Sequence, residues 1–169
     1  MVPWPAEVWV IDTSSITEIR RQLPKPDQVT VYASLTTLAT AGQLVFPVQV
    51  LKELERAANP KPGQPDRPLD WCKAVAGTAV SNPSMDTLKE VLALVPEVLD
   101  PDKPRGAEEA DPYILARAVE LKRAGRDVTI ITQDKIDKPR KLSLSSAAGI
   151  LKLPDVAVLA FLKSQGLMP

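Results

Sequence analysis

Four acidic residues that lie far apart in the sequence could form one metal-binding site if the fold brings them together. Each stands near the end of an apolar segment or the start of a helix, and they are Asp12, Glu53, Asp111 and Asp134. Carboxylates a few ångströms apart repel each other by roughly 4 kcal/mol per pair at an effective dielectric near 20, so several together require protons or cations. Ligand sets made only of oxygen favour hard ions, first of all Mg²⁺ or Mn²⁺. A carboxylate metal site is therefore the first chemical hypothesis.

The residue inventory excludes most other catalytic sites. The chain has no histidine and a single cysteine, Cys72, which rules out a Ser-His-Asp triad, a Cys-His pair and the common zinc sites. None of the seven glycines begins a Walker A sequence or a Gly-x-Gly-x-x-Gly motif, so ATP and dinucleotide binding lose support. Basic and acidic residues balance at 21 each, so any contact with a nucleic acid must come from a local basic patch.

The composition is that of an ordinary globular protein. The chain has 169 residues, of which 44% are hydrophobic and 25% charged, and this predicts a single domain over residues 1–169. One cysteine cannot form an internal disulfide, and no early segment has the pattern of a signal peptide. No apolar run approaches the length that spans a membrane. We therefore expect a cytoplasmic protein with no membrane partner.

The apolar pattern predicts strands that alternate with helices. Val8 to Ile11 form a short β-branched and aromatic run, typical of a strand buried on both faces. Further strands are expected at residues 44–46, 128–131 and 150–153. Helices are expected at residues 15–23, 29–41, 48–58, 69–80, 86–95, 111–124 and 143–149, and from Asp155 to about residue 166, with loops at 59–68 and 101–106. This order indicates an α/β protein with a parallel sheet covered on both faces.

In such sheets, functional groups collect beyond the carboxyl ends of the strands. Asp12 and Asp134 follow predicted strands and lie there by sequence alone. Glu53 and Asp111 belong to predicted helices, so only the packing of those helices could bring them to the same place. The sequence therefore predicts half of the site directly and leaves the other half to the tertiary structure.

Each acidic residue also has an ordinary structural interpretation. Asp12 could cap a helix or close a turn, although a Ser15-x-x-Glu18 capping box already serves the helix that follows. Asp111 before Pro112 has the form of a helix N-cap, and Asp134 could end a strand at a turn. Glu53 and Glu55 both lie off the apolar stripe of their helix, so periodicity does not choose between them, and either could be a solvated side chain.

Four short segments resemble the motifs of the PIN-domain family, whose members are metal-dependent ribonucleases and include many bacterial toxins of toxin–antitoxin pairs. The segments are Val10-Ile11-Asp12-Thr13-Ser14-Ser15, Val50-Leu51-Lys52-Glu53-Leu54, Ala110-Asp111-Pro112-Tyr113-Ile114-Leu115-Ala116 and Ile130-Ile131-Thr132-Gln133-Asp134-Lys135. Their order agrees with the family, and the Glu-Leu pair of the second motif favours Glu53 over Glu55. The chain looks like the subgroup known as DUF4411. It departs from the family's pattern at Ser14, where asparagine is frequent.

The resemblance implies a three-layer α/β/α sandwich with a central, mainly parallel sheet. It implies that one or two Mg²⁺ or Mn²⁺ ions are held, directly or through water, by Asp12, Glu53, Asp111 and Asp134, with the hydroxyls of Ser14 and Thr132 orienting these ligands. The implied activity is hydrolysis of single-stranded RNA. The implied partners are RNA, a protein antitoxin and a second copy of the chain.

Basic residues beyond the fourth motif could contact RNA. They are Lys135, Lys138, Arg140 and Lys141, and Arg20 and Arg21 near the first predicted helix are further candidates. Basic residues in loops are as often simply solvated surface, so this assignment stays open.

Other readings of the acidic residues remain to be separated. A haloacid-dehalogenase-like phosphohydrolase would need Asp-x-Asp, whereas this chain has Asp12-Thr13-Ser14. A response-regulator receiver domain would need an acidic pair at the end of its first strand. A PIN-like scaffold or partner-binding protein without nuclease activity fits the same motifs, and an assay for cleavage of single-stranded RNA would distinguish it from a nuclease.

Overall fold

Four parallel strands form the centre of the computed structural model, which describes residues 6–58, 63–103 and 108–169. The strands are β1 (Glu7–Ile11), β2 (Leu44–Val45), β3 (Asp127–Ile131) and β4 (Asp155–Val156). They lie in the order β2-β1-β3-β4 and every pairing is parallel. In the central pair, Val8 faces Val128 and Ile11 faces Ile131. Most residues of β1, β2 and β3 are buried between helices, which explains why these strands read as continuous apolar runs in the sequence.

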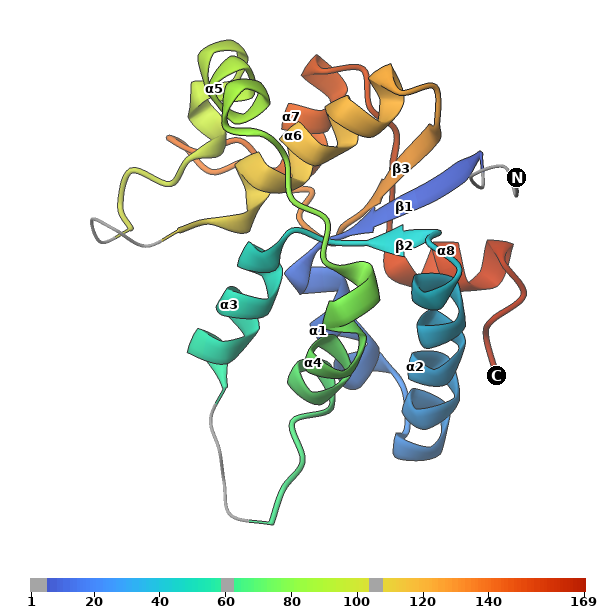
Figure 1. Cartoon of the computed structure of the whole chain (residues 1–169). Coiled ribbons are helices and arrows are strands. Elements are labelled where there is room, and N and C mark those ends of the chain that lie inside the picture. Colours follow the sequence, from blue (N-terminus) through green and yellow to red (C-terminus); the bar gives the residue numbers. More distant parts are fainter. Residues whose placement is uncertain (1–5, 59–62, 104–107) are drawn as a thin grey trace.

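Helices cover both faces of the sheet, so the predicted three-layer α/β/α architecture is confirmed. In Figure 1, α5, α6 and α7 lie on one face, and α1, α2, α4 and α8 lie on the other. The helices are α1 (Thr13–Gln22), α2 (Lys25–Thr40), α3 (Val48–Ala57), α4 (Arg67–Ala79), α5 (Met85–Leu94), α6 (Ala110–Arg123), α7 (Leu144–Ile150) and α8 (Val158–Ser164), with a 3-10 turn at Pro96–Val98. Helix α3 follows β2 and packs against α1, α4 and α6.

Several expected bounds differ from the structure: α2 begins at Lys25 and not at residue 29, and the differences near the acidic residues and the last strand concern three helix starts and one strand. Helix α1 begins at Thr13, so Ser15 lies inside the helix, buried, and the predicted capping box is wrong. Helix α6 begins at Ala110 with Glu109 at the cap position, so Asp111 lies in the first turn and does not cap it. Asp155 belongs to β4 and not to a helix cap, because the last strand lies later than the predicted residues 150–153.

The reason for these differences is that local patterns compete with tertiary contacts. A short apolar run at the end of a helix cannot be told from a strand by its pattern alone, and residues 150–153 are the end of α7 and a turn. The expected loop at residues 59–68 lies partly outside the described residues, and α4 already begins at Arg67. The loop expected at 101–106 is described only to Lys103, which lies in a turn.

The connectivity creates a crevice between β1 and β3. From β1 the chain passes to β2 on one side, and it later returns to β3 and β4 on the other side of β1. Asp12 follows β1 directly, and its backbone N–H donates to the carbonyl of Ile131 at the end of β3 (2.9 Å). In parallel α/β sheets, such a reversal of strand order is where ligands bind, outside the carboxyl ends of the strands.

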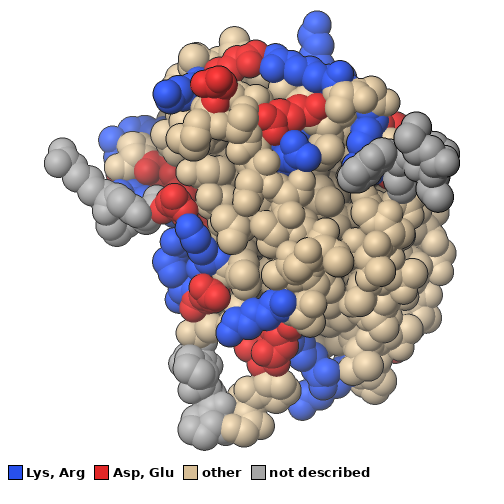
Figure 2. All heavy atoms as spheres, viewed as in Figure 1, with Lys and Arg blue, Asp and Glu red and all other residues tan. Residues whose placement is uncertain are grey.

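Charge is spread over the surface without one dominant sign. On the face seen in Figure 2, basic and acidic side chains lie next to one another along one side, and the surface over α2 is largely uncharged. No helix within the described residues is both long enough and apolar enough to cross a membrane.

Candidate functional site

A cavity of about 480 Å³ is lined by all four of the acidic residues singled out in the sequence. Asp12 comes from the end of β1, Glu53 from α3, Asp111 from the first turn of α6 and Asp134 from the segment after β3. Helix packing therefore brings Glu53 and Asp111 to the crevice where Asp12 and Asp134 already lie. The described lining also includes Thr13, Ser14, Thr17, Ala57, Asp100, Lys103, Ile136, Lys138, Lys141, Leu142 and Ser143.

Asp12 is the most deeply buried of the four, with 4% of its surface exposed. It stands at the cap position of α1, but its side chain makes no capping hydrogen bond. Its Oδ2 instead accepts hydrogen bonds from the hydroxyls of Ser14 (2.7 Å) and Thr132 (2.8 Å). Burial raises the pKa of Asp12 to about 6 against the effect of these two hydrogen bonds, and the charges of Glu53 and Asp134 raise it further.

The two hydroxyls that contact Asp12 have fixed orientations. Thr132 Oγ1 accepts from the backbone N–H of Asp134 (3.0 Å), and Ser14 Oγ accepts from the backbone N–H of Gln133 (3.1 Å). Each hydroxyl therefore directs its own proton to the carboxylate of Asp12. These contacts tie the segment after β3 to the start of α1, and the role of Ser14 and Thr132 in orienting metal ligands stays a prediction.

Glu53 is held at the same cavity from the side of α3. Its Oε1 accepts from the hydroxyl of Thr13 (2.6 Å), and its Oε2 accepts from the backbone N–H of Ala110 (3.4 Å). Glu55 on the same helix is exposed and is not among the described residues that line the cavity. The structure therefore distinguishes two glutamates that apolar periodicity could not.

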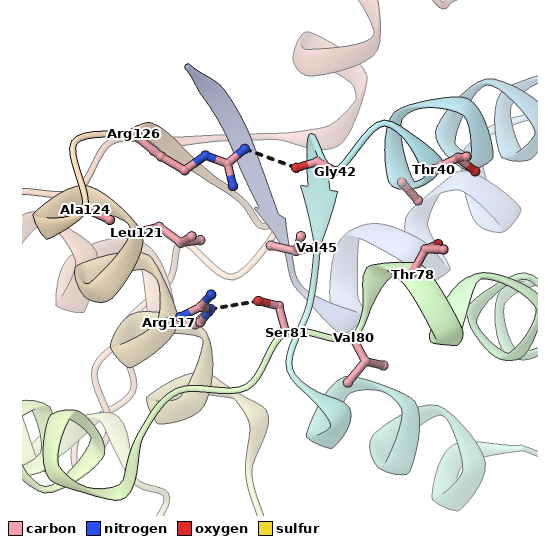
Figure 3. Close-up of a pocket in the computed structure, with 11 residues that line it drawn as sticks. Thr40, Gly42, Val45, Thr78, Val80, Ser81, Arg117, Leu121, Ala124 and Arg126 are labelled. Atoms are coloured by element: carbon pink, nitrogen blue, oxygen red, sulfur yellow. Dashed lines mark hydrogen bonds between the residues drawn. The ribbon is translucent and has the colours of Figure 1, made fainter. Parts of the chain in front are cut away.

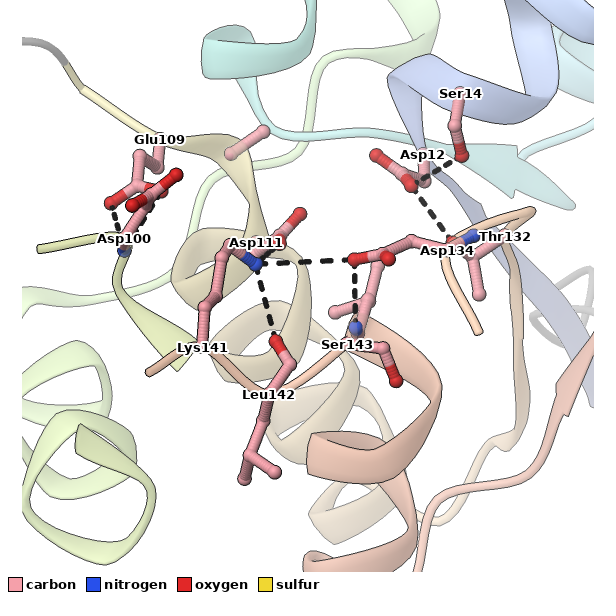
Figure 4. A network of polar contacts seen from close by, with 12 residues as sticks. Asp12, Ser14, Asp100, Glu109, Asp111, Thr132, Asp134, Lys141, Leu142 and Ser143 are labelled. Carbon is pink, nitrogen blue, oxygen red and sulfur yellow. Dashed lines mark hydrogen bonds and ion pairs between the residues drawn. The ribbon is translucent and has the colours of Figure 1, made fainter. Parts of the chain in front are cut away.

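Asp111 and Asp134 share a cation supplied by the protein. The ammonium group of Lys141 donates to Asp111 Oδ2 (3.0 Å) and to the carbonyl of Leu142 (3.2 Å), and it lies 3.9 Å from Asp134 Oδ2 (Figure 4). Asp134 Oδ2 also accepts from the backbone N–H of Leu144 at the start of α7 (2.9 Å). The sequence named Lys141 only as a candidate RNA contact, because spacing gives no indication that its side chain turns inward.

The electrostatics of this pair follow from burial and from the neighbouring charges. Burial raises the pKa of Asp111 to about 7, with a further contribution from the charge of Asp12, while Lys141 acts in the opposite direction. Partial burial alone would lower the pKa of Lys141, but the charge of Asp111 and its hydrogen bond raise the pKa above its usual value. Lys141 is therefore a permanent positive charge inside a group of carboxylates.

The donor chemistry of the cavity fits a hard divalent ion. Asp12, Asp111 and Asp134 each use Oδ2 for the hydrogen bonds above, and their Oδ1 atoms accept none from the residues the structure describes. As the side chains stand, however, no three Asp, Glu or Cys side chains of the described chain are grouped closely enough to hold an ion. Binding of Mg²⁺ or Mn²⁺ would require the carboxylates to draw together and Lys141 to move.

A family model described as a domain of unknown function, DUF4411, matches residues 9–168. The chain belongs to the DUF4411 family. No match to a curated protein was found. The matched region of this DUF4411 chain contains all four acidic residues and every described residue that lines their cavity, so the site lies within the part of the chain that the family model matches. The resemblance to DUF4411 expected from the sequence is confirmed.

Of the four basic residues beyond the fourth motif that were proposed to contact RNA, two lie at the cavity of the DUF4411 chain and two do not; Arg20 and Arg21 of α1 are not among the described residues that line it and pair with Asp66 and Glu18. Lys138 and Lys141 line it. Lys135 pairs with Asp155 (3.6 Å), and Arg140 pairs with Asp102 at an exposed position. Lys103 lines the cavity and was missed, because the sequence placed it in a loop with no indication of where that loop lies.

A second cavity of the DUF4411 chain, of about 520 Å³, lies at the edge of β2 near the amino ends of the strands (Figure 3). Arg117 donates to the hydroxyl of Ser81 (2.7 Å) and to Glu120 (2.9 Å), and Arg126 donates to the carbonyl of Gly42 (3.1 Å). No carboxylate is among the described residues that line this cavity. Of these two cavities, judged by their described lining, the first combines carboxylates, hydroxyls and lysines and the second does not.

We predict that the metal-free DUF4411 domain loses stability as the pH rises from about 4 to about 7, the interval between the ordinary pKa and the raised pKa values of two aspartates. Asp12 and Asp111 have folded-state pKa values of about 6 and about 7, above the ordinary value of 3.8. Their protonated forms favour folding, so this contribution is complete below the ordinary pKa and is lost as the pH passes through 6 and 7. Thermal melting in EDTA across this range measures the effect. An Asp12→Asn, Asp111→Asn double variant should show a flatter dependence, and equal slopes would contradict the assignment.

Proposed function

We propose that this DUF4411 domain is a PIN-like, metal-dependent endoribonuclease that hydrolyses phosphodiester bonds in single-stranded RNA. The observation that carries this proposal is that carboxylates from four separate segments line one cavity at the reversal of strand order. Asp12, Glu53, Asp111 and Asp134 would hold Mg²⁺ or Mn²⁺. The four motifs that resemble the PIN-domain family supply these same residues in the family's order, which supports PIN-like membership.

A bound ion would supply charge stabilisation at the scissile phosphate and a more acidic water as nucleophile. The residues of the chain itself would position the reacting groups. Asp12 is held by two oriented hydroxyls in a buried setting, so its carboxylate loses little freedom when it acts. Asp134 is fixed by the backbone N–H of Leu144, and Glu53 by Thr13. Such prior positioning is what phosphoryl chemistry requires, since most of its catalysis is placement and electrostatics.

The mouth of the cavity suits a single strand of RNA. Lys138 and Lys103 line it and bring positive charge near the path of the phosphates, and Lys103 also pairs with Glu109 (3.6 Å). Ile136 also lines it and is 82% exposed, which provides an apolar surface for a base that is not stacked in a duplex. A role as the toxin of a toxin–antitoxin pair belongs to the same proposal, with a protein antitoxin and a second copy of the chain as partners. Its support is the family resemblance alone.

One observation favours a second candidate, a PIN-like scaffold or partner-binding protein without catalysis. Lys141 already neutralises part of the charge of Asp111 and Asp134, and no described group of side chains is ready to hold an ion. A protein that used these carboxylates only for internal ion pairing would keep this arrangement permanently. The two candidates differ in whether added metal produces RNA cleavage.

The test is cleavage of single-stranded RNA by the wild-type chain in Mn²⁺ or Mg²⁺, compared with a Glu53→Gln and a Glu55→Gln variant. We expect cleavage that EDTA stops, a loss of at least about tenfold for Glu53→Gln, and nearly full activity for Glu55→Gln. The two variants carry the same chemical change on the same helix, but only Glu53 lines the cavity. A gel assay on several unstructured RNAs provides the measurement.

Equal loss in both variants would indicate damage to α3 and not to a site. Absence of cleavage by the wild-type chain on every RNA tested, in either metal, would favour the scaffold.

A further inference from the structure

Lys141 is half-buried, and its ammonium group lies among the carboxylates and not on the surface with the other basic residues of its loop. Only 13% of its side chain is exposed, whereas 67% of the neighbouring Arg140 side chain is exposed. Its ammonium group contacts Asp111 Oδ2 at 3.0 Å and lies 3.9 Å from Asp134 Oδ2. Figure 4 shows this nitrogen between the two aspartates. The lysine therefore stands among the oxygens that a divalent ion would need.

The backbone around Lys141 is firmly anchored, and only its side chain is free to change place. The backbone N–H groups of Lys138 and Lys141 donate to each other's carbonyls (2.8 and 3.2 Å). The N–H of Leu142 donates to the carbonyl of Glu97 (2.8 Å), and the N–H of Ser143 donates to Asp137 Oδ1 (2.8 Å). A lysine side chain has a flexible stem of four carbons, so its ammonium group could leave the cavity without any movement of this loop.

Lysine and metal compete for the same atoms. Asp111 Oδ2 accepts the shortest of the Lys141 contacts, and the cavity has no histidine or thiol to serve as a substitute ligand. An ammonium group and a divalent ion side by side in a buried setting would repel each other strongly. Either cation relieves the repulsion among the carboxylates, so the metal-free chain is stabilised by the lysine that occupies the position.

We propose that Lys141 is an internal counter-ion that fills the cation position of the metal-free protein and limits metal affinity, because its ammonium group must leave Asp111 and Asp134 before a divalent ion binds. This inference rests on the proposed metal-dependent function. It adds a regulatory property to the site: metal occupancy depends on displacement of a residue from the chain itself. The carboxylates come close enough together to hold an ion only after the lysine has moved. For this reason no such group of side chains is present among the described residues.

Calorimetric titration with Mn²⁺ alone tests the inference without RNA and without an activity assay. We expect Lys141→Met to bind Mn²⁺ more tightly than the wild-type chain by at least about tenfold, equivalent to about 1.4 kcal/mol. Lys141→Gln should show the same direction, and it retains a hydrogen-bond donor for Asp111 in case the methionine variant folds poorly. Lys138→Met is the matched control, since Lys138 lines the same cavity but its ammonium group contacts no carboxylate of the described residues.

Thermal melting provides a second measurement. Without metal, Lys141→Met should melt below the wild-type chain because the carboxylates lose their counter-ion, and Mn²⁺ should raise its melting temperature by more than it raises that of the wild-type chain. Equal or weaker Mn²⁺ binding by both Lys141 variants would overturn this inference and leave the proposed function standing. A gain as large in Lys138→Met would also overturn it, since general charge would then explain the result. Absence of Mn²⁺ binding by every protein would overturn both the inference and the metal-dependent function.

Discussion

An Asp12→Asn variant is expected to lose RNA cleavage by at least about a hundredfold while its metal-free form becomes more stable than the wild-type chain at about pH 7.5. The carboxylate is 4% exposed, and burial raises its pKa to about 6, so its charged form destabilises the fold at that pH. Asparagine has the same shape and no charge. Its amide oxygen can accept the hydrogen bonds of Ser14 and Thr132, and its NH₂ group can face the other carboxylates. The expected gain is on the order of 1–3 kcal/mol.

Opposite changes in activity and stability are the signature of a residue kept for chemistry at the expense of stability. The measurements are a gel assay of RNA cleavage in Mn²⁺ and thermal melting in EDTA. Asp70→Asn on the exposed surface of α4 is the matched control, and both properties should stay close to those of the wild-type chain. If Asp12→Asn destabilised the metal-free chain, Asp12 would be a structural carboxylate and the proposed role would be wrong.

Thr132→Val is expected to lower cleavage by about 10- to 100-fold and to destabilise the chain by about 1–3 kcal/mol. The hydroxyl of Thr132 is fully buried, donates to Asp12 and accepts from the backbone N–H of Asp134. Valine has nearly the same volume, so the change removes these two hydrogen bonds without creating a cavity. Asp12 would lose one of the two groups that orient it, and a buried N–H would lose its acceptor. Cleavage rates and urea unfolding measure the two effects.

Two further variants separate the hydroxyl from the packing of the side chain at this position. Thr132→Ser retains the hydroxyl and should recover most of the activity. Thr129→Val makes the same chemical change three residues earlier, on β3, where the hydroxyl forms no hydrogen bond with the described residues, and it should be almost neutral. If Thr132→Val were fully active, the contact between Thr132 and Asp12 would have no part in catalysis.

The fold brings together the few kinds of polar side chain that this chain has available for a site. Without histidine and with one buried cysteine, it relies on carboxylates, hydroxyls and lysine. The crevice between β1 and β3 concentrates these groups because the strand order reverses there. Burial in this crevice raises the pKa values of Asp12 and Asp111, because it removes their carboxylates from water, and the neighbouring carboxylates raise them further.

The sequence alone predicted the features that depend on short-range pattern and on inventory. Continuous apolar runs indicated β1, β2 and β3, since strands buried on both faces have no polar alternation. The absence of histidine confined the chemistry to oxygen ligands. The positions of Asp12 and Asp134 directly after strands placed them at the carboxyl end of the sheet, because all parallel strands end at the same edge.

Only the tertiary structure decided which further side chains reach that edge. Glu53 and Glu55 are two residues apart, about 200° around a helix, so the rotation of α3 against α1 and α6 selects one of them. The capping patterns at Ser15 and Asp111 misled for different reasons. Helix α1 begins at Thr13, so Ser15 lies inside it, whereas Asp111 lies in the first turn of α6 and is bound by a distant partner, Lys141. That partner lies 30 residues away in the sequence. The periodicity of a single helix or strand cannot predict such a contact, because the contact depends on how the helices and strands pack against one another.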